Sequence, residues 1–481
     1  MDARPSRGDD DPMPDVATSP SDLLTRLAGS AHLDGDRLVI DDQTAFRDAP
    51  IRDLAWTAAF SIDEPTIDAA QWLIWEASQV LGAPSASIQA LYDARARGEV
   101  SGFTVPAINL RAQTFDMART VFETAEAADV GAVILEIARS EQTYTFQRPI
   151  DFATAALAGA IAAGWQGPVF LQGDHYQFNA KKYAADPEAM TEEIRRACRL
   201  AVDAGYRNID IDSSTLVDLS KANVDEEQRE NYTRAAELTA LIRTLETDGV
   251  TISVGGEIGE VGTRNSTVAE LRAYLDGYRR ELEQRAPGAR TISKVSVQTG
   301  TSHGGVPLPD GGVAEVKLDF EVLRELGEVA RSYGLAGAVQ HGASTLPDAL
   351  FHRFPAVETA EIHLATGFQN ALYEHPAFPE SLHREIETWC FENLADERKP
   401  EQTDQQFVYT SRKKAIGPFK RQLWDLDSRD EILASQRRKI AYLFSELRVN
   451  DSRAMVDRYV TPVELHRPIP SSLREAVAAG R

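Results

Sequence analysis

Residues 168–214 read PVFLQGDHYQFNAKKYAADPEAMTEEIRRACRLAVDAGYRNIDIDSS. Two apolar, β-branched runs, 168–174 and 208–214, are typical of buried strands. Between them, residues 190–205 have the apolar spacing of a helix. The order strand, helix, strand predicts a unit with two parallel strands.

The same alternation continues on both sides of this stretch. Because eight parallel strands close a (β/α)₈ TIM barrel, we predict that α/β fold, and an open doubly wound sheet, which requires no particular strand count, is the alternative. The expected strands are 103–109, 132–137, 168–174, 208–214, 251–257, 292–300, 336–342 and 359–367.

The barrel is expected to occupy residues 101–372. Residues 1–20 are polar and proline-rich, which indicates a disordered tail. Helical patterns predict an N-terminal extension over 21–100 and a C-terminal extension over 373–481. These extensions could cover the barrel or form an oligomer interface.

Composition narrows the class of protein. The chain has 481 residues, and 51 basic against 74 acidic residues give a net charge of -23, so no nucleic-acid partner is expected. Its two cysteines, Cys198 and Cys390, argue against a disulfide framework. No secretory signal or apolar run of membrane-spanning length is present, which predicts a cytoplasmic protein without a membrane partner.

Polar residues follow the predicted strands, where barrels place their active sites. His175, Glu257, His303 and His341 each stand beside or near glycine, and three imidazoles with one carboxylate can hold a zinc ion. Cobalt, manganese or iron(II) would also suit this set. Asp174 precedes the first histidine and could transfer a proton. Taken singly, any of these residues is more often structural.

The turns after two strands suggest an anion site as well. HGG (303–305) and HGAS (341–344) expose backbone N–H groups, and the hydroxyls of Ser344 and Thr366 could add further donors for a phosphate. Tight packing at barrel turns is the alternative interpretation.

An ordered set of motifs resembles class II, zinc-dependent fructose-bisphosphate aldolases and their tagatose-bisphosphate relatives, over residues 86 to 370. The motifs are VPAIN, GDHYQFNAKKY, NIDIDSS with EEQRENYTRAAEL, GGEIGEVG, TGTSHGG with VKLDFEVLREL, and QHGAS. The resemblance implies a role for each of the following residues: metal ligands His175, Glu257, His303 and His341; acid/base Asp174; phosphate- or substrate-binding Gly304, Gly342, Ser344, Thr366, Asn109 and His363; and Asp212 as an acidic residue near the metal.

Several positions depart from the family pattern. His363 stands where the family has a substrate-binding asparagine, with Ala365 two residues later, and Ala138 replaces a serine. At the catalytic base of the family the chain has Asn265 or a neighbour, and Glu260 is the nearby carboxylate and candidate base.

The resemblance implies a lyase of carbohydrate metabolism, such as glycolysis. It would cleave a ketose phosphate or bisphosphate reversibly to dihydroxyacetone phosphate and an aldehyde through a zinc-stabilised enediolate, as a homodimer or higher homo-oligomer. Alternatives are a metal-dependent lyase with a different or unphosphorylated substrate, a non-catalytic barrel subunit and, least favoured, a metal-dependent hydrolase. A basic cluster, listed here, could bind the far phosphate or be a solvated helix face: Arg412, Lys413, Lys414, Lys420 and Arg421.

Overall fold

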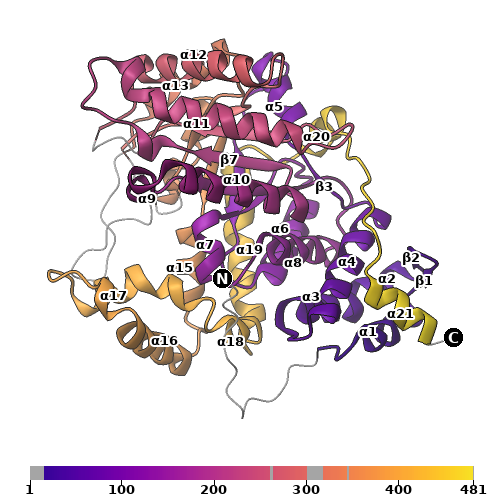
Figure 1. Ribbon diagram of the computed structural model, residues 1–481. Helices are drawn as coiled ribbons and strands as arrows, with labels where there is room; N and C mark the ends of the chain where they lie inside the picture. The colour runs from indigo at the N-terminus through magenta and orange to yellow at the C-terminus, as the bar shows by residue number, and fades with distance from the viewer. Residues whose placement is uncertain (1–15, 260–263, 301–317, 344–345, 480–481) are drawn as a thin grey trace.

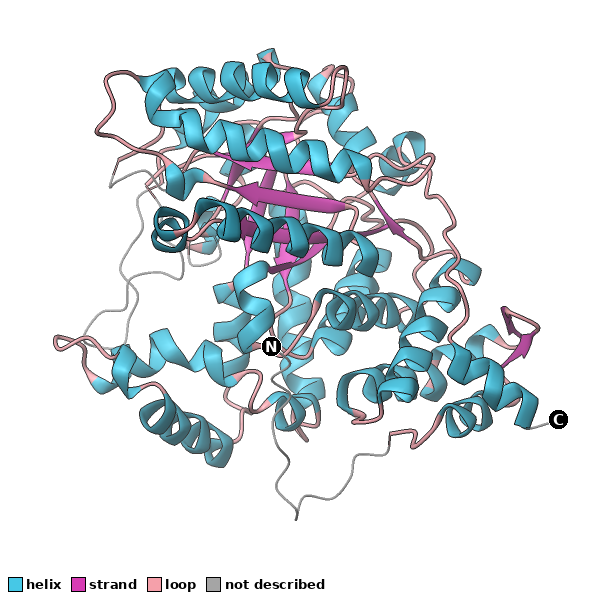
Figure 2. Ribbon diagram, viewed as in Figure 1, coloured by secondary structure: helices cyan, strands magenta, loops and turns pink. Residues whose placement is uncertain are grey.

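A computed structural model describes residues 16–259, 264–300, 318–343 and 346–479. Eight parallel strands form a closed barrel, in the order β6-β5-β4-β11-β10-β9-β8-β7, and pairing of β6 with β7 completes the ring. Figure 2 shows these strands at the centre with helices around them. Their bounds are β4 Val105–Asn109, β5 Ile134–Ala138, β6 Val169–Gln177, β7 Asn208–Asp212, β8 Ser253–Glu257, β9 Lys294–Ser296, β10 Ala338–Gln340 and β11 Glu361–Leu364.

The predicted (β/α)₈ barrel is therefore confirmed, and the open sheet is excluded by the closing pair. Each of the eight predicted runs overlaps one barrel strand. A short additional strand, β3 (Ser85–Ala86), pairs with the start of β6 and lies at the N-terminal end of the barrel.

Helices of the barrel follow its strands and cover the outside. They are α6 Thr114–Ala127, α7 Arg139–Tyr144, α8 Pro149–Ala162, α9 Ala180–Ala185, α10 Pro187–Ala204, α11 Val224–Thr244, α12 Val268–Arg285, α13 Phe320–Ser332, α14 Arg353–Ala356 and α15 Thr366–Tyr373, with short 3₁₀ turns η1 Ser214–Leu216 and η3 Asp348–Leu350.

Helix α10 illustrates how the sequence sets these elements. The side chain of Asp186 caps its first turn by accepting from the Ala189 N–H, and Pro187 occupies the first helical position. Buried Ile194 and Cys198, four residues apart, lie on the face toward the barrel. The helix ends at Gly205, whose φ of 104° is the left-handed conformation that glycine adopts easily.

The N-terminal extension packs beside the barrel rather than forming a separate lobe. Its elements are α1 Pro20–Leu27, β1 Ala31–Asp34, β2 Arg37–Ile40, α2 Gln43–Arg47, α3 Ala49–Phe60, α4 Glu64–Val80 and α5 Gln89–Ala96. Helix α4 is buried on nearly every side between α3, α8 and the C-terminal segment. Val16 and Ala17, within the predicted tail, are also buried.

The C-terminal extension has two parts, seen in orange and yellow in Figure 1. The first part gathers around a small apolar core that includes Ile386, Phe407 and Leu423, whereas α19 returns to pack on α6 and α15. Its elements are α16 Glu380–Asn393, η4 Ala395–Glu397, α17 Asp404–Ser411, η5 Arg412–Ala415, α18 Lys420–Trp424, α19 Arg429–Glu446, α20 Arg453–Tyr459 and α21 Ser471–Ala479.

The two extensions are joined by tryptophans. The indole N–H of Trp75 donates to the Leu465 carbonyl (2.6 Å), that of Trp72 to the Arg467 carbonyl (3.0 Å), and that of Trp56 to Asp425 Oδ1 (3.0 Å). In the described part of the chain, none of the helices is both long and apolar enough to span a bilayer. Both cysteines are buried free thiols.

Candidate metal and proton-transfer site

A bulge in β6 brings two consecutive residues to one side of the barrel. Neighbours on a regular strand point to opposite faces, but the pairing of β6 with β7 shifts register between Gly173 and Tyr176. His175 has a φ of 44°, a strained left-handed conformation for a non-glycine residue. Its Nε2 consequently lies 3.8 Å from Oδ1 of Asp174.

Glycine makes this turn feasible. A Cβ on Gly173 would stand 2.4 Å from the ring of Tyr176, which packs over it. The bulge therefore depends on a residue without a side chain at position 173.

Three predicted ligands meet at the carboxyl ends of β6, β8 and β10. Nδ1 of His175 lies 3.5 Å from Oε2 of Glu257, and Nδ1 of His341 lies 4.0 Å from that oxygen. One atom from each residue lies within 4.8 Å of the others. Two imidazoles and a carboxylate are a zinc-type donor set, so these residues fit a divalent metal. The fourth predicted ligand, His303, is outside the described residues.

Asp212, at the end of β7, contacts Nδ1 of His175, the nitrogen that also faces Glu257, and this contact leaves Nε2 for a metal. Its Oδ2 lies 3.1 Å from His175 Nδ1 and accepts from Gln177 Nε2 at 2.5 Å. Its Oδ1 accepts from the backbone and hydroxyl of Ser214, at 3.1 and 2.7 Å. Burial raises the pKa of Asp212, but the hydrogen bonds from His175, Ser214 and Gln177 outweigh it and lower this pKa. A carboxylate behind a ligand histidine fixes the orientation of its ring.

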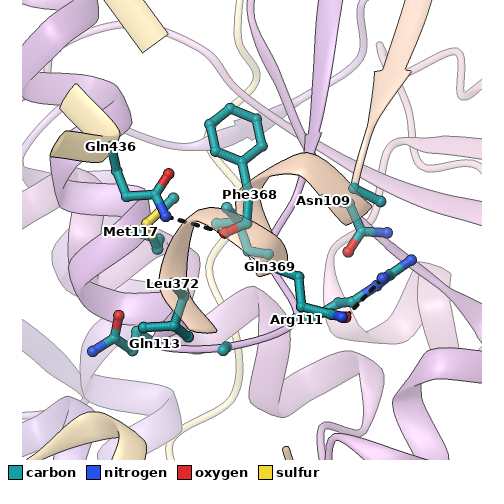
Figure 3. A pocket seen from close by; sticks show the side chains of 11 residues that line it. Asn109, Arg111, Gln113, Met117, Phe368, Gln369, Leu372 and Gln436 are labelled. Carbon is teal, nitrogen blue, oxygen red and sulfur yellow. Dashed lines mark hydrogen bonds between the residues drawn. The ribbon is translucent and has the colours of Figure 1, made fainter. Parts of the chain in front are cut away.

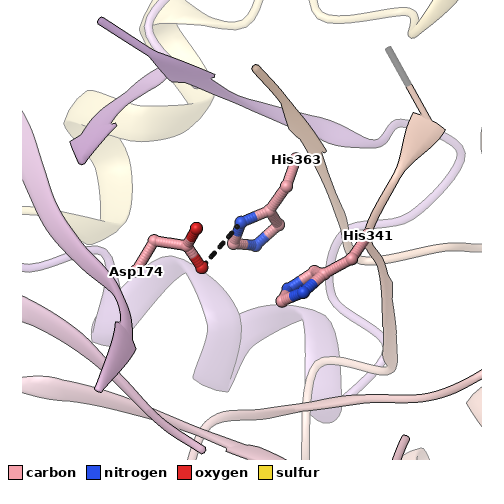
Figure 4. A group of neighbouring side chains, drawn as sticks. All are labelled: Asp174, His341 and His363. Carbon is pink, nitrogen blue, oxygen red and sulfur yellow. Dashed lines mark ion pairs between the residues drawn. The ribbon is translucent and has the colours of Figure 1, made fainter. Parts of the chain in front are cut away.

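His363 lies beside His341 and faces Asp174 (Figure 4). The ring centroids of the two histidines are 4.1 Å apart, and His363 Nδ1 is 3.3 Å from Oδ1 of Asp174. Asp174, His341 and His363 form a second group whose ligand atoms lie within 4.8 Å of one another. Burial lowers the pKa of His363, but Glu136 and Asp174 outweigh it and raise this pKa well above its usual value.

Below His363 the barrel interior holds a layer of charged residues. Lys294 Nζ lies 3.0 Å from Asp210 Oδ2 and also contacts Glu361. Burial raises the pKa of Glu136 to about 8 and that of Asp210 to about 6. Burial also acts to raise the pKa of Glu361, but Lys294 and His363 outweigh it and lower this pKa to about 2. Lys294 therefore favours the ionised form of Glu361, whereas burial favours the protonated form of Glu136.

Sequence reasoning missed this charged layer. Glu136, Asp210, Lys294 and Glu361 each lie on a barrel strand and are at most 8% exposed. Lysine and glutamate are almost never fully buried unless they are paired. A charged residue inside an apolar strand pattern, such as Glu136 in VILEI or Lys294 in ISKVS, could therefore have indicated buried ion pairs.

At the rim of β4, a buried ion pair lies near the site. Arg111 contacts Glu141 Oε1 through Nε (2.7 Å) and Nη2 (2.6 Å), and Asn109 Nδ2 donates to Glu141 Oε2 (2.6 Å). The N–H of Ala138 donates to the same oxygen at 3.0 Å, at the position where the family pattern has serine. Burial lowers the pKa of Arg111, but Glu141 outweighs it and raises this pKa above its ordinary value.

A pocket adjoins this rim between β4, α6, α15 and α19 (Figure 3). Arg111 also donates to Gln369 Oε1 at 2.9 Å, at the edge of this pocket. The remaining lining is mostly apolar, including Met117, Phe368 and Leu372.

The predicted phosphate residues are only partly described. Gly342 follows β10 with a φ of 69°, and Thr366 opens α15, so both stand at strand ends on the ligand side of the barrel. Gly304, Ser344 and the candidate base Glu260 lie outside the described residues. Asn265 Nδ2 contacts Asp319 Oδ2 at 3.5 Å.

Most of the predicted basic cluster is engaged locally. Arg412 is buried and donates to Asn370 Oδ1 and Glu374 Oε1, and Lys414 pairs with Glu397. The other members also have contacts: Lys420 donates to the Phe146 carbonyl and Arg421 pairs with Asp425. The cluster is therefore not a simple solvated helix face. Lys413 lies on η5, which contacts α7, the helix that carries Glu141 at the rim of β4. Burial lowers the pKa of Lys413, and the charge of Arg111 lowers it further.

Solved structures resemble this chain at low sequence identity. A probable tagatose 6 phosphate kinase from Sinorhizobium meliloti superposes with a TM-score of 0.51 at 17% identity, over 78% of this chain and 98% of that one, which supports the fold. The YdjI aldolase from Escherichia coli gives 0.40 at 17% identity, over 72% and 98%. Fructose-bisphosphate aldolase from Campylobacter jejuni gives 0.44 at 16%, over 77% and 97%.

No curated protein matches the chain in sequence. The family described as "Fructose-bisphosphate aldolase class-II" matches residues 89–420, which is well over half of the chain and includes the whole barrel. This match supports an aldolase-type enzyme. The chain belongs to the class-II fructose-bisphosphate aldolase family.

Proposed function

We propose that this protein is a metal-dependent aldolase that reversibly cleaves a ketose phosphate into dihydroxyacetone phosphate and an aldehyde. The observation that carries this proposal is the convergence of His175, Glu257 and His341 beside Asp174, from three different strand ends. Family membership supports the same reaction class.

The donor set favours zinc as the resident metal, held by His175, Glu257 and His341 together with the predicted ligand His303. When bound, such an ion polarises the substrate carbonyl and stabilises negative charge on its oxygen. Asp212 supports this function because it fixes the ring of His175 by its 3.1 Å contact.

Asp174 is proposed as the acid/base for the carbon–carbon bond. In the cleavage direction its carboxylate takes the proton from the hydroxyl on the carbon that becomes the aldehyde. The electron pair of the broken bond stays with the donor fragment. In synthesis Asp174 returns that proton, and a separate base, for which Glu260 is the candidate, exchanges the proton on the donor carbon.

The substrate is proposed to be anionic at its donor end. Backbone N–H groups near Gly304 and Gly342 and the hydroxyls of Ser344 and Thr366 would hold the donor phosphate. If the substrate carries a second phosphate, Lys413 and Arg111 are the cations that would attract it, because both lie near the rim of β4.

A second candidate is a metal-dependent lyase for a different or unphosphorylated donor. The observation in its favour is the chemistry of the inner wall, where His363 and Ala138 replace the amide and the hydroxyl of the family pattern. Competition tests separate the two: inorganic phosphate should inhibit the first enzyme and leave the second unaffected.

The deciding experiment follows the C3 proton of dihydroxyacetone phosphate in D₂O by NMR, with metal-free and zinc-loaded protein. We expect zinc-dependent loss of this signal. A zinc-loaded protein that leaves the signal unchanged would contradict dihydroxyacetone phosphate as donor. A panel of fructose- and tagatose-1,6-bisphosphate would then identify the ketose that is cleaved fastest.

A further inference from the structure

We propose that His363 is a positioning residue for Asp174, rather than a ligand of the donor substrate or of the metal, and that Glu361 and Lys294 hold it in place. This inference rests on the proposed aldolase function. It gives the charged layer inside the barrel the role of positioning Asp174. The metal and phosphate sites do not explain why this layer is present.

Carboxylates face both nitrogens of His363. Nδ1 lies 3.0 Å from Oε2 of Glu136 and 3.3 Å from Oδ1 of Asp174. Nε2 lies 2.8 Å from Oε1 of Glu361 and 3.7 Å from Oδ2 of Asp210. None of these four contacts has hydrogen-bond geometry, so charge attraction rather than hydrogen bonding orients the ring. Both nitrogens nevertheless face carboxylates of the protein, and the side chain is only 5% exposed.

Glu361, the closest of these partners, is itself fixed from several sides. It is fully buried, and one of its oxygens accepts from the phenol of Tyr92 on α5. Its other oxygen accepts from Gln172 Nε2 at 2.9 Å and contacts Lys294. A carboxylate with partners on strands β6 and β9 and on helix α5 cannot swing away from His363.

Lys294, on β9, completes the support. Its ammonium also donates to Gln172 Oε1 at 2.7 Å and lies 3.0 Å from Asp210 Oδ2. Three of its neighbours are thus held by one cation, and Lys294 is only 1% exposed. An unpaired carboxylate at this depth would be strongly unfavourable, so the lysine makes the layer viable.

The consequence reaches Asp174 through the 3.3 Å contact with His363 Nδ1. Attraction to the His363 ring keeps Oδ1 of Asp174 on the side of this histidine, which sets where the other carboxylate oxygen meets a reacting hydroxyl. Proton transfer is sensitive to such placement, because a shift of about 1 Å can reduce a rate about a hundredfold.

The test uses His363→Gln, Glu361→Gln, Asp174→Asn and the double variant His363→Gln/Asp174→Asn. His352→Gln is the matched control, because that histidine is exposed and also faces a carboxylate, with Nδ1 3.8 Å from Glu446 Oε2. Each variant is assayed for zinc per chain, the absorption spectrum of the Co²⁺ form, exchange of the C3 proton of dihydroxyacetone phosphate, and cleavage of the preferred ketose bisphosphate.

We expect His363→Gln to keep its zinc and its Co²⁺ spectrum. Proton exchange should stay within about threefold of the unmodified enzyme, while cleavage falls about a hundredfold with KM nearly unchanged. Adding His363→Gln to Asp174→Asn should cause almost no further loss, since the histidine acts through the aspartate. Glu361→Gln should likewise reduce cleavage more than proton exchange, but by a smaller factor. This variant provides the test if His363→Gln does not fold.

Three results would overturn the inference. Loss of zinc or a changed Co²⁺ spectrum in His363→Gln would make His363 a metal ligand. Equal falls in exchange and cleavage, or a raised KM, would make it a donor-binding residue. If the fold-losses of cleavage activity in the two single variants multiplied in the double variant, His363 would act independently of Asp174. Failure of the proposed function is distinguishable, because the unmodified, zinc-loaded enzyme would then show neither exchange nor cleavage.

Discussion

Lys294 and Asp210 meet across a glycine: Lys294 Nζ lies 3.0 Å from Asp210 Oδ2, and Gly255 on the strand between them is in register with both residues. A Cβ built on Gly255 would stand 2.2 Å from Asp210 Oδ1 and 3.0 Å from Lys294 Cε. The missing side chain of Gly255 therefore provides the space in which a buried ion pair can form.

Gly255→Ala should consequently destabilise the fold by about 1–3 kcal/mol through overpacking, with a larger effect if the ion pair breaks. The matched control is Gly327→Ala on α13, where the nearest atom to a new Cβ is a flexible arginine nitrogen at 3.4 Å. That change should be neutral or slightly stabilising. Denaturant unfolding of both variants is the measurement, and equal midpoints would refute the steric argument.

Replacing the acid/base should separate chemistry from metal binding. Asp174→Asn should lower turnover of the preferred ketose bisphosphate by about a hundredfold or more, because the proton of the reacting hydroxyl loses its acceptor. Zinc content, measured by metal analysis, should be unchanged. Full turnover in this variant would remove Asp174 from the mechanism.

Metal affinity should depend on His341 and, less strongly, on Asp212. His341→Ala removes a donor and should abolish stoichiometric zinc at micromolar concentrations. Asp212→Asn leaves every ligand in place but weakens the contact that orients His175, so affinity should fall about 10- to 100-fold. Titration with a competing chelator measures both effects, and an unchanged affinity in Asp212→Asn would show that His175 needs no such support.

The buried Glu136 predicts a pH dependence of stability in the metal-free protein. Burial raises the pKa of Glu136 from its ordinary 4.5 to about 8, so between these values the folded chain holds a proton that the unfolded chain releases. The stability contribution from this group is therefore full below pH 4.5 and is lost as the pH rises to about 8.

Glu136→Gln removes that titration while keeping the shape of the side chain. The difference in unfolding free energy between the two proteins should change with pH between about 4.5 and 8 and be constant above that range. Denaturant melts at several pH values provide the measurement. A difference that does not vary with pH would mean that Glu136 is ionised in the folded protein.

The C-terminal segment should be needed for the stability of the N-terminal extension. A chain that ends at Tyr459 loses the Leu465 and Arg467 carbonyls that accept from Trp75 and Trp72. It also exposes apolar surface around both rings, and one large buried side chain contributes roughly 1.5–3 kcal/mol. We expect several kcal/mol of destabilisation and a red-shifted tryptophan emission.

Arg474→Ala is the control for that truncation, because Arg474, on the same segment, pairs with Asp36 at the exposed surface. An exposed ion pair of this kind is worth at most about 1 kcal/mol. If the truncated chain were as stable as this control, the segment would not contribute to the stability of the N-terminal extension.

The barrel could be predicted from the sequence, because alternating apolar runs and helical spacing are local patterns that each segment carries independently. The sequence also indicated which residues stand at the strand ends, so His175, Glu257 and His341 could be predicted to meet at one end of the barrel. The motif order was enough to indicate the family. None of these predictions required a distance between remote residues.

The contacts between these groups could not be predicted from the sequence, because they depend on how the strands pair. The bulge that turns Asp174 and His175 to the same side arises from the pairing of β6 with β7, and sequence periodicity predicts the opposite faces. The contacts of Lys294 with Asp210 and Glu361 join three strands that are far apart along the chain. Such contacts follow from closure of the barrel, since closure places side chains from every strand around one axis and makes each depend on its neighbours for charge balance.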